Sequence, residues 1–90
     1  MKLTFNLKFY HGTEIECVEP IRKEGFHPDS ASCAVRDYKH ARGYGKTVVS
    51  FIYPYSIHIK DIFWLLRNVR YLMIAVYGFK PDNLKIETRD

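Results

Sequence analysis

The first ten residues place the strictest constraint on the fold. Apolar side chains occupy every second position, at Leu3, Phe5, Leu7 and Phe9. This alternation predicts a β-strand with one buried face, which must pack against a second layer. His11 continues the parity of the apolar face, and Gly12 frees the backbone to turn or to let a ligand approach. We therefore expect residues 10–13 to end the strand and to open the functional cleft.

The next segment predicts a short helix. Thr13 and Glu16 have the spacing of a capping box, in which the threonine caps the helix and the glutamate reaches back. Pro20 would break a helix interior, so we expect it in the first turn of a helix over residues 20–24. Gly25 is a natural end for that helix.

The rest of the chain predicts a helix, a strand, a helix and two strands, over residues 34–44, 47–53, 62–69, 71–77 and 84–87. Pro54 is expected to stop the second strand, and Asp61 to cap the third helix. This order predicts a single α+β domain over residues 1–90, with a mixed or antiparallel sheet and about three short helices.

Length and composition narrow the class of protein. Ninety residues fit one domain, and its core must be dense and aromatic, which agrees with 7 Tyr, 6 Phe and 1 Trp. The apolar runs are too short to span a bilayer, and the start of the chain lacks the pattern of a signal peptide. We expect a protein of the cytoplasm without a membrane contact. Cys17 and Cys33 are expected to be buried thiols.

Basic residues gather between residues 36 and 46. The chain carries a formal charge of +4, and Arg36, Lys39, Arg42 and Lys46 surround His40. Such a patch attracts a phosphate, a dinucleotide or nucleic acid, although an ordinary solvated helix face has the same composition. Metal-ligand spacing, a P-loop and a dinucleotide-binding glycine pattern are absent from the sequence, so no metal site is predicted.

His11 is the strongest candidate among the four histidines. A strand end beside a helix N-terminus offers free backbone N–H groups, and the imidazole donates or accepts a hydrogen bond there. The alternative interpretation is a partly buried histidine that closes the strand. On the third helix, Phe63 and Trp64 are expected in the core, and would mark a partner surface if they were exposed together.

Four motifs follow one another in order. Tyr-His-Gly-Thr at 10–13 precedes Ile-Arg-Lys-Glu-Gly-Phe at 21–26, then Ala-Arg-Gly-Tyr at 41–44 before an apolar strand, and Phe-Lys-Pro-Asp-Asn-Leu-Lys-Ile at 79–86. Together they resemble the ADP-ribosyltransferase superfamily over most of the chain. The resemblance implies an ADP-ribosyltransferase-like fold and an NAD site.

By this resemblance, His11 binds the adenosine ribose, the backbone of Gly12 holds the nicotinamide amide, and Thr13 completes the motif. Tyr44 stacks on the nicotinamide, as an aromatic ring suits a flat heterocycle. Tyr44 as ordinary packing at a helix end is the alternative. Arg42 or Lys46 is a candidate for contact with the pyrophosphate.

The sequence departs from the family pattern at two places. The family's second tyrosine falls near Cys33, and the strand that normally begins with the catalytic glutamate starts at Arg70 without an acid. Asp82 and Glu87 are late acids in a different element.

Two functions follow from this sequence. The first is a minimal ADP-ribosyltransferase, a phage, viral or mobile-element effector that transfers ADP-ribose to a macromolecular acceptor. The second is a catalytically degenerate module that binds nucleic acid or an acidic protein through residues 36–46. The acceptor and the oligomeric state are not encoded in any motif.

Overall fold

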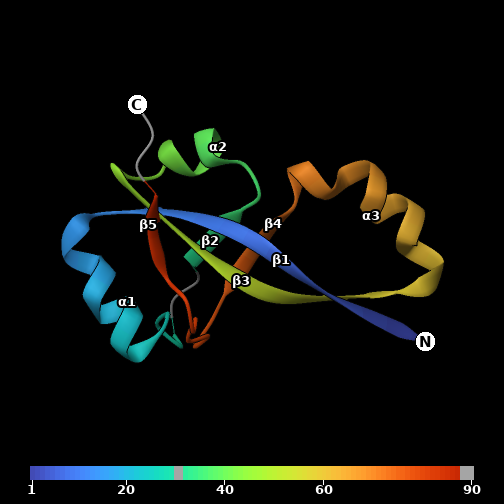
Figure 1. The fold of residues 1–90 in the computed structure, drawn as a ribbon, viewed down its shortest axis with the longest axis horizontal. Helices are drawn as coiled ribbons and strands as arrows, with labels where there is room; N and C mark the ends of the chain where they lie inside the picture. Colours follow the sequence, from blue (N-terminus) through green and yellow to red (C-terminus); the bar gives the residue numbers. More distant parts are fainter. Residues whose placement is uncertain (30–31, 88–90) are drawn as a thin grey trace.

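A five-stranded sheet organises the computed structural model, which describes residues 1–29 and 32–87 (Figure 1). The elements in chain order are β1 (Lys2–Thr13), η1 (Ile15–Cys17), α1 (Val18–Glu24), β2 (Ser32–Val35), α2 (Tyr38–Arg42), β3 (Thr47–His58), η2 (Ile59–Asp61), α3 (Ile62–Asn68), η3 (Val69–Tyr71), β4 (Met73–Val76) and β5 (Lys85–Glu87). The strand order is β4-β2-β1-β3-β5, and every neighbouring pair is antiparallel. The predicted α+β class, with a mixed or antiparallel sheet and about three helices, is confirmed, and the sheet is of the antiparallel kind.

The longest pairing joins β1 and β3. Their register runs without interruption from Lys2 opposite His58 to Thr13 opposite Thr47. Because strand side chains alternate between faces, this register divides the pair into two faces. We call one the α1 face, which carries Phe9, His11, Val49 and Phe51. The other is the α2 face, which carries Lys8, Tyr10, Gly12, Val48 and Ser50.

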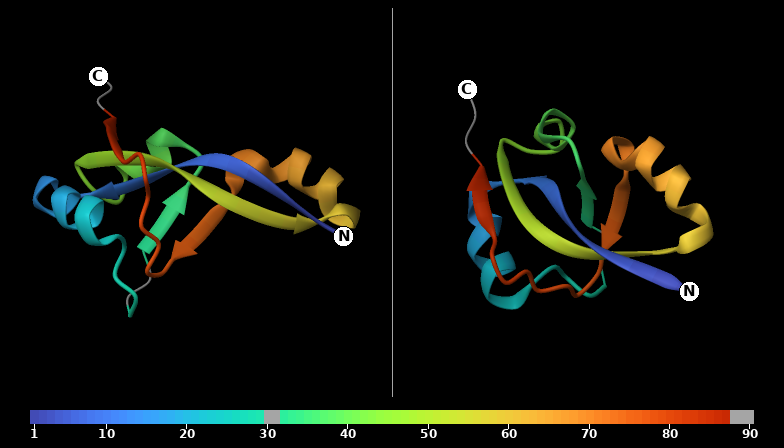
Figure 2. Two further views of the ribbon diagram at one scale, coloured as in Figure 1. Left: turned by 60° about the horizontal axis from the view of Figure 1, so that its bottom comes forward. Right: turned by 45° about the vertical axis from the view of Figure 1, so that its right-hand side comes forward.

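The main core lies on the α1 face. Its buried members come from β1, β2, β3, β4, α1, α3 and the connections around them: Phe9, Val18, Ile21, Phe26, Ala34, Val49, Phe51, Leu65, Leu72, Val76 and Leu84. A smaller cluster on the α2 face joins Val35, Ala41 and Val48. Figures 1 and 2 show α1 and α2 on opposite sides of the β1–β3 pair. The predicted alternation of β1 is confirmed, since Phe9 is fully buried on one face.

β3 continues through Pro54, where the sequence predicted its end. Pro54 lies opposite Asn6, and the pairing of β3 with β5 extends only over residues 48–50. A proline is tolerated in a strand where its backbone nitrogen is not required to donate a hydrogen bond to a neighbouring strand. Residues 55–58 are therefore the end of the same long strand.

The predicted helix over residues 34–44 is wrong in its first part. Residues 32–35 form β2, which pairs with β4, and α2 covers only residues 38–42. Ala34 and Val35 are buried in different clusters, as alternation in a strand requires. The four residues of β2 are too few for their hydrophobic pattern to distinguish a strand from a helix. Pairing with β4 makes this segment a strand.

The capping box at Thr13 is also wrong. Thr13 is the last residue of β1, and the first helical turn starts after Glu14, which makes no side-chain capping bond. β1 ends at Thr13, which pairs with Thr47, so the strand ends within residues 10–13 as predicted. Gly25 ends α1 as predicted, with a φ of 85° that favours glycine.

Phe63 and Trp64 are exposed by 78% and 53%, so their predicted burial is wrong. α3 has seven residues, and Leu65 is the only one of them that is fully buried. The predicted burial of Cys17 and Cys33 is wrong as well, because both free thiols are exposed. None of the helices in residues 1–29 and 32–87 is long and apolar enough to cross a membrane.

Two neighbouring leucines of α3 test this orientation. Leu65 is 4% exposed and Leu66 is 68% exposed. We expect Leu65→Ala to lower the free energy of unfolding by about 2–4 kcal/mol, since it leaves a cavity in the core. Leu66→Ala is expected to change it by less than about 0.5 kcal/mol. Urea denaturation of both variants measures the difference, and equal losses would contradict the described packing of α3.

Candidate functional site

β1 and β2 separate at His11. Among the described residues, β1 pairs with β2 only where Tyr10 lies opposite Val35. The imidazole of His11 bridges the gap that follows, with its Nδ1 2.8 Å from the carbonyl oxygen of Cys33. We call this opening, between residues 11–13 of β1 and the start of β2, the β1–β2 gap.

The backbone of Gly12 points into the β1–β2 gap. In an antiparallel strand, the N–H and C=O of successive residues point to opposite neighbours. Arg36 lies just after β2, and its Nη1 donates to the carbonyl oxygen of Lys8. The carbonyl of Lys8 therefore points towards β2. The uninterrupted β1–β3 register carries this alternation forward, so the N–H and C=O of Gly12 point to the β2 side as well.

A hollow of about 370 Å³ lies beside the β1–β2 gap, on the α1 face. Its walls include His11 and Thr13 from the strand, Glu16 and Glu24 from the α1 side, and Phe26 and Pro28 from the loop after α1. Lysine and arginine do not line it within the described residues. With two carboxylates and no lysine or arginine among its described lining residues, this hollow suits a positively charged group.

His11 is held in one orientation. Its ring packs edge-on against Phe26, with centroids 5.2 Å apart. Because a carbonyl only accepts, the bond to Cys33 requires the proton on Nδ1, which leaves Nε2 as an acceptor in the neutral ring. His11 is therefore partly buried with a satisfied nitrogen, as its alternative interpretation expects, and it also borders the hollow.

α2 and the turn after it cover Gly12. A side-chain carbon at Gly12 would lie 1.9 Å from the carbonyl oxygen of Ala41. One at Gly45 would lie 2.5 Å from the backbone nitrogen of Thr13. The two glycines therefore let β1 and the turn approach each other closely. In this structure the close approach predicted at Gly12 is made by the chain's own backbone, and Gly12 is buried.

The predicted site residues divide between the two faces. His11 and Thr13 border the hollow on the α1 face, whereas Tyr44 and Arg42 belong to α2 and the turn after it. Tyr44 is half-exposed, and its ring lies 5.6 Å from that of His40. Neither Tyr44 nor Arg42 lines the hollow. The structure thus brings His11, Gly12 and Thr13 together and places Tyr44 across the strand from His11.

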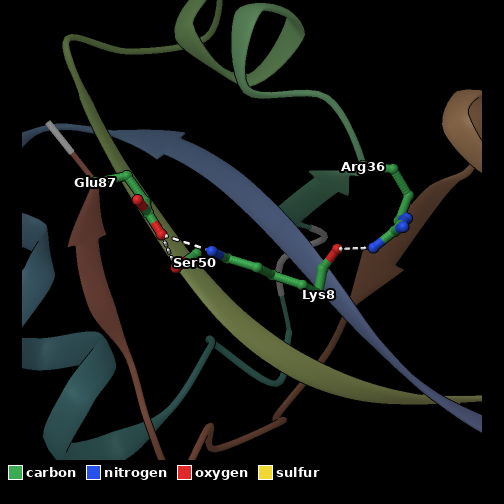
Figure 3. A network of polar contacts seen from close by, with 4 residues as sticks. All are labelled: Lys8, Arg36, Ser50 and Glu87. Carbon is green, nitrogen blue, oxygen red and sulfur yellow. Dashed lines mark hydrogen bonds and ion pairs between the residues drawn. The ribbon is translucent and has the colours of Figure 1, made fainter. Parts of the chain in front are cut away.

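The late acid Glu87 lies on the α2 face, away from His11. Glu87 pairs with Val48, and its Oε1 lies 2.9 Å from Nζ of Lys8 (Figure 3). The hydroxyl of Ser50 donates to the same oxygen at 2.7 Å. The hydrogen bond that Lys8 donates to Glu87 raises the pKa of Lys8 above its ordinary value of 10.5, against a smaller opposing effect of desolvation. This carboxylate is therefore engaged by a lysine and a serine on the sheet surface.

Sequence reasoning missed the acids of the hollow. Glu24 lies four residues after Pro20, so both lie on one side of α1, and this spacing was the available signal. Glu16 lies in η1, an element that the sequence did not predict because Thr13 and Glu16 have the spacing of a capping box. No group of three or more histidine, cysteine, aspartate or glutamate side chains in the described ranges is placed to hold a metal ion.

Comparison of the chain with protein-family models, with curated proteins and with solved structures finds no match.

Gly12→Ala tests the contact between β1 and α2. The added carbon collides with backbone atoms of Ala41, so we expect a loss of about 2 kcal/mol or more in the free energy of unfolding. Gly43→Ala is the matched control, because its nearest neighbour lies 3.3 Å away and its backbone is helical. We expect this control to change stability by less than about 1 kcal/mol. Equal stabilities in thermal unfolding would count against the close packing of Gly12.

Glu87→Gln tests the ion pair with Lys8. We expect the pKa of Lys8 to fall towards 10.5 in this variant, as followed by NMR titration of the lysine side chain. A raised pKa stabilises the fold fully below the unfolded value and loses that effect as the pH rises through the folded value. The stability difference between wild type and variant should therefore shrink above about pH 10.5. An unchanged titration of Lys8 would refute the pair.

Proposed function

We propose that this chain is a minimal ADP-ribosyltransferase-like domain that binds NAD at the β1–β2 gap and transfers ADP-ribose to a macromolecular acceptor. The observation that carries the proposal is the gap itself, which joins the His-Gly-Thr motif to a hollow of about 370 Å³. A strand edge that loses its partner offers backbone groups to a ligand.

Gly12 supports the proposal through its backbone. Its N–H and C=O point to the β2 side, where an amide such as that of nicotinamide finds one donor and one acceptor. His11 stands one residue before it with Nε2 available as an acceptor for a ribose hydroxyl. These are the roles that the resemblance assigns to the two residues.

The charge of the hollow supports the nicotinamide end of NAD in particular. The nicotinamide ring of NAD is a cation, and bond cleavage moves its positive charge onto the ribose as neutral nicotinamide leaves. Glu16 and Glu24 line the hollow, and we take them as candidates for the acid that the sequence leaves unassigned. Carboxylates placed near developing positive charge contribute roughly 10²–10³ in rate.

In the proposed reaction, the bond between the ribose carbon and the nicotinamide nitrogen breaks, and nicotinamide leaves with the electron pair. A nucleophile of the acceptor forms the new bond to the same carbon and loses its proton. Gly12 is buried under α2 in this structure, so NAD binding requires the turn over residues 43–45 to move. Tyr44 lies in that turn on the α2 side of β1, so the stacking that the resemblance assigns to it is not built into the hollow on the α1 face.

The proposal also includes the cellular location and the acceptor. We place the protein in the cytoplasm, and in the host cytoplasm if it is a viral or phage effector. The acceptor is a protein or a nucleic acid in this account.

NAD titration followed by NMR tests the proposal. We expect amide shifts to cluster at residues 11–13 and around Phe26, which surround the gap and the hollow. His11→Ala should weaken NAD binding about tenfold, because it removes a hydrogen-bonding group from the site. His58→Ala is the matched control, since His58 is exposed at the far end of β3. Release of nicotinamide in the same samples separates binding from turnover.

The absence of any shift at millimolar NAD would overturn the NAD proposal. Equal binding by wild type and His11→Ala would overturn the assignment of the site to the gap.

A second candidate function has its own observation. Lys39, Arg42 and Lys46 are exposed on and after α2, where they form a basic surface. This favours a module without transfer activity that binds nucleic acid. Binding to a random oligonucleotide that weakens steeply with salt, with no response to NAD, would select this function.

A further inference from the structure

We propose a second ligand site, a phosphate-binding pocket for a nucleotide, between the start of α2 and η3. A pocket of about 490 Å³ lies there, lined by Arg36, Asp37, His40, Arg70 and Tyr71. We call it the two-arginine pocket. It shares no lining residue with the hollow at His11, so it stands independently of the proposed NAD site.

The fold brings these residues together from distant segments. Arg36 and Asp37 connect β2 to α2, whereas Arg70 and Tyr71 close the turn between α3 and β4. β2 and β4 are neighbours in the sheet, with Val35 opposite Met73, so the segments that follow and precede them meet at one edge. The pocket therefore joins Arg36, from the basic segment around His40, to Arg70, which lies more than thirty residues after Arg36 in the chain.

Arg36 is held in place as part of this pocket. Its Nη1 donates to the carbonyl of Lys8 at 2.6 Å, which fixes the guanidinium at the open edge of β1 (Figure 3). Its Nε is buried without a hydrogen-bond partner among the described residues. A partly buried cation with one unpaired donor leaves an excess of positive potential, which a nearby anion reduces.

The charges of the two-arginine pocket favour an anion. Arg36 and Arg70 each contribute a positive charge, and neither has an ion-pair partner among the described residues. Asp37 offsets one of the two charges, so the lining stays positive, and His40 is a further donor when protonated. Arginine is the side chain best shaped to bind phosphate oxygens, because its planar guanidinium donates two parallel hydrogen bonds.

Tyr71 extends the recognition from phosphate to nucleotide. Its side chain is 75% exposed at the rim of the pocket and is not used by the core. An exposed aromatic ring beside a phosphate site is a stacking platform for a nucleobase. The ligand that fits both features is a phosphate joined to a base, either as a free nucleotide or as part of a single strand.

NMR titrations with inorganic phosphate, AMP and a short single-stranded oligonucleotide test this proposal. We expect AMP to shift the amides of residues 36–40 and 70–71, and to bind about tenfold more tightly than phosphate because the base stacks on Tyr71. Tighter binding of the oligonucleotide than of AMP identifies a nucleic-acid strand as the ligand, and the reverse order identifies a free nucleotide.

Two variants separate the pocket from general electrostatics. Arg70→Gln should weaken AMP binding about tenfold or more, whereas Arg67→Gln, an equal change of charge on exposed α3 outside the pocket, should leave it unchanged. Tyr71→Ser should bring the affinity for AMP down to that for phosphate. His11→Ala should leave AMP binding at this pocket unchanged, which distinguishes it from the proposed NAD site.

The proposal is overturned if millimolar phosphate and AMP leave residues 36–40 and 70–71 unshifted, or if Arg67→Gln weakens binding as much as Arg70→Gln.

Discussion

The long antiparallel ladder between β1 and β3 is the constraint on which the rest of this structure depends. Its register pairs Phe9 with Phe51 and places both in the main core. A shift of one residue would reverse every side chain on β1, burying Lys8 and exposing Phe9. The same register sets His11 on the α1 face and Gly12 on the α2 face, so the two residues of the motif serve opposite sides of one strand.

Both proposed ligand sites lie where the β1–β3 ladder extends beyond the pairing of β1 with β2. β2 pairs with β1 at a single position among the described residues, which leaves the β1–β2 gap on one side of Tyr10 and a free edge on the other. His11 occupies the first opening and Arg36 the second, each through a hydrogen bond to a backbone carbonyl. The two proposed ligand sites therefore lie along one incompletely paired strand edge.

The sequence predicts the parts of the fold that local patterns determine. Alternation in β1, the glycine at the end of α1 and the apolar centre of β3 needed no partner to be recognised. β2, by contrast, is a strand because β4 and β1 flank it, and Pro54 is accepted because β5 ends before it. Phe63 and Trp64 look like core residues by type, but the short α3 has only one buried position to offer.

The candidate site was predictable only in part, for the same reason. The motif identifies His11 and Gly12, and the structure places them at an opening. The acids of the hollow and the arginine of the second pocket come from other segments, whose approach no local pattern encodes. Face and register, which depend on distant partners, also decide that Glu87 joins Lys8 and not His11.

Nuclear Overhauser effects between the protein and bound NAD will show whether the β1–β2 gap receives the nicotinamide, as we propose. We expect contacts from the nicotinamide ring protons to the amide of Gly12 and to the ring of Phe26. Contacts confined to Tyr71 and its neighbours would instead place NAD in the two-arginine pocket and would refute the proposed site.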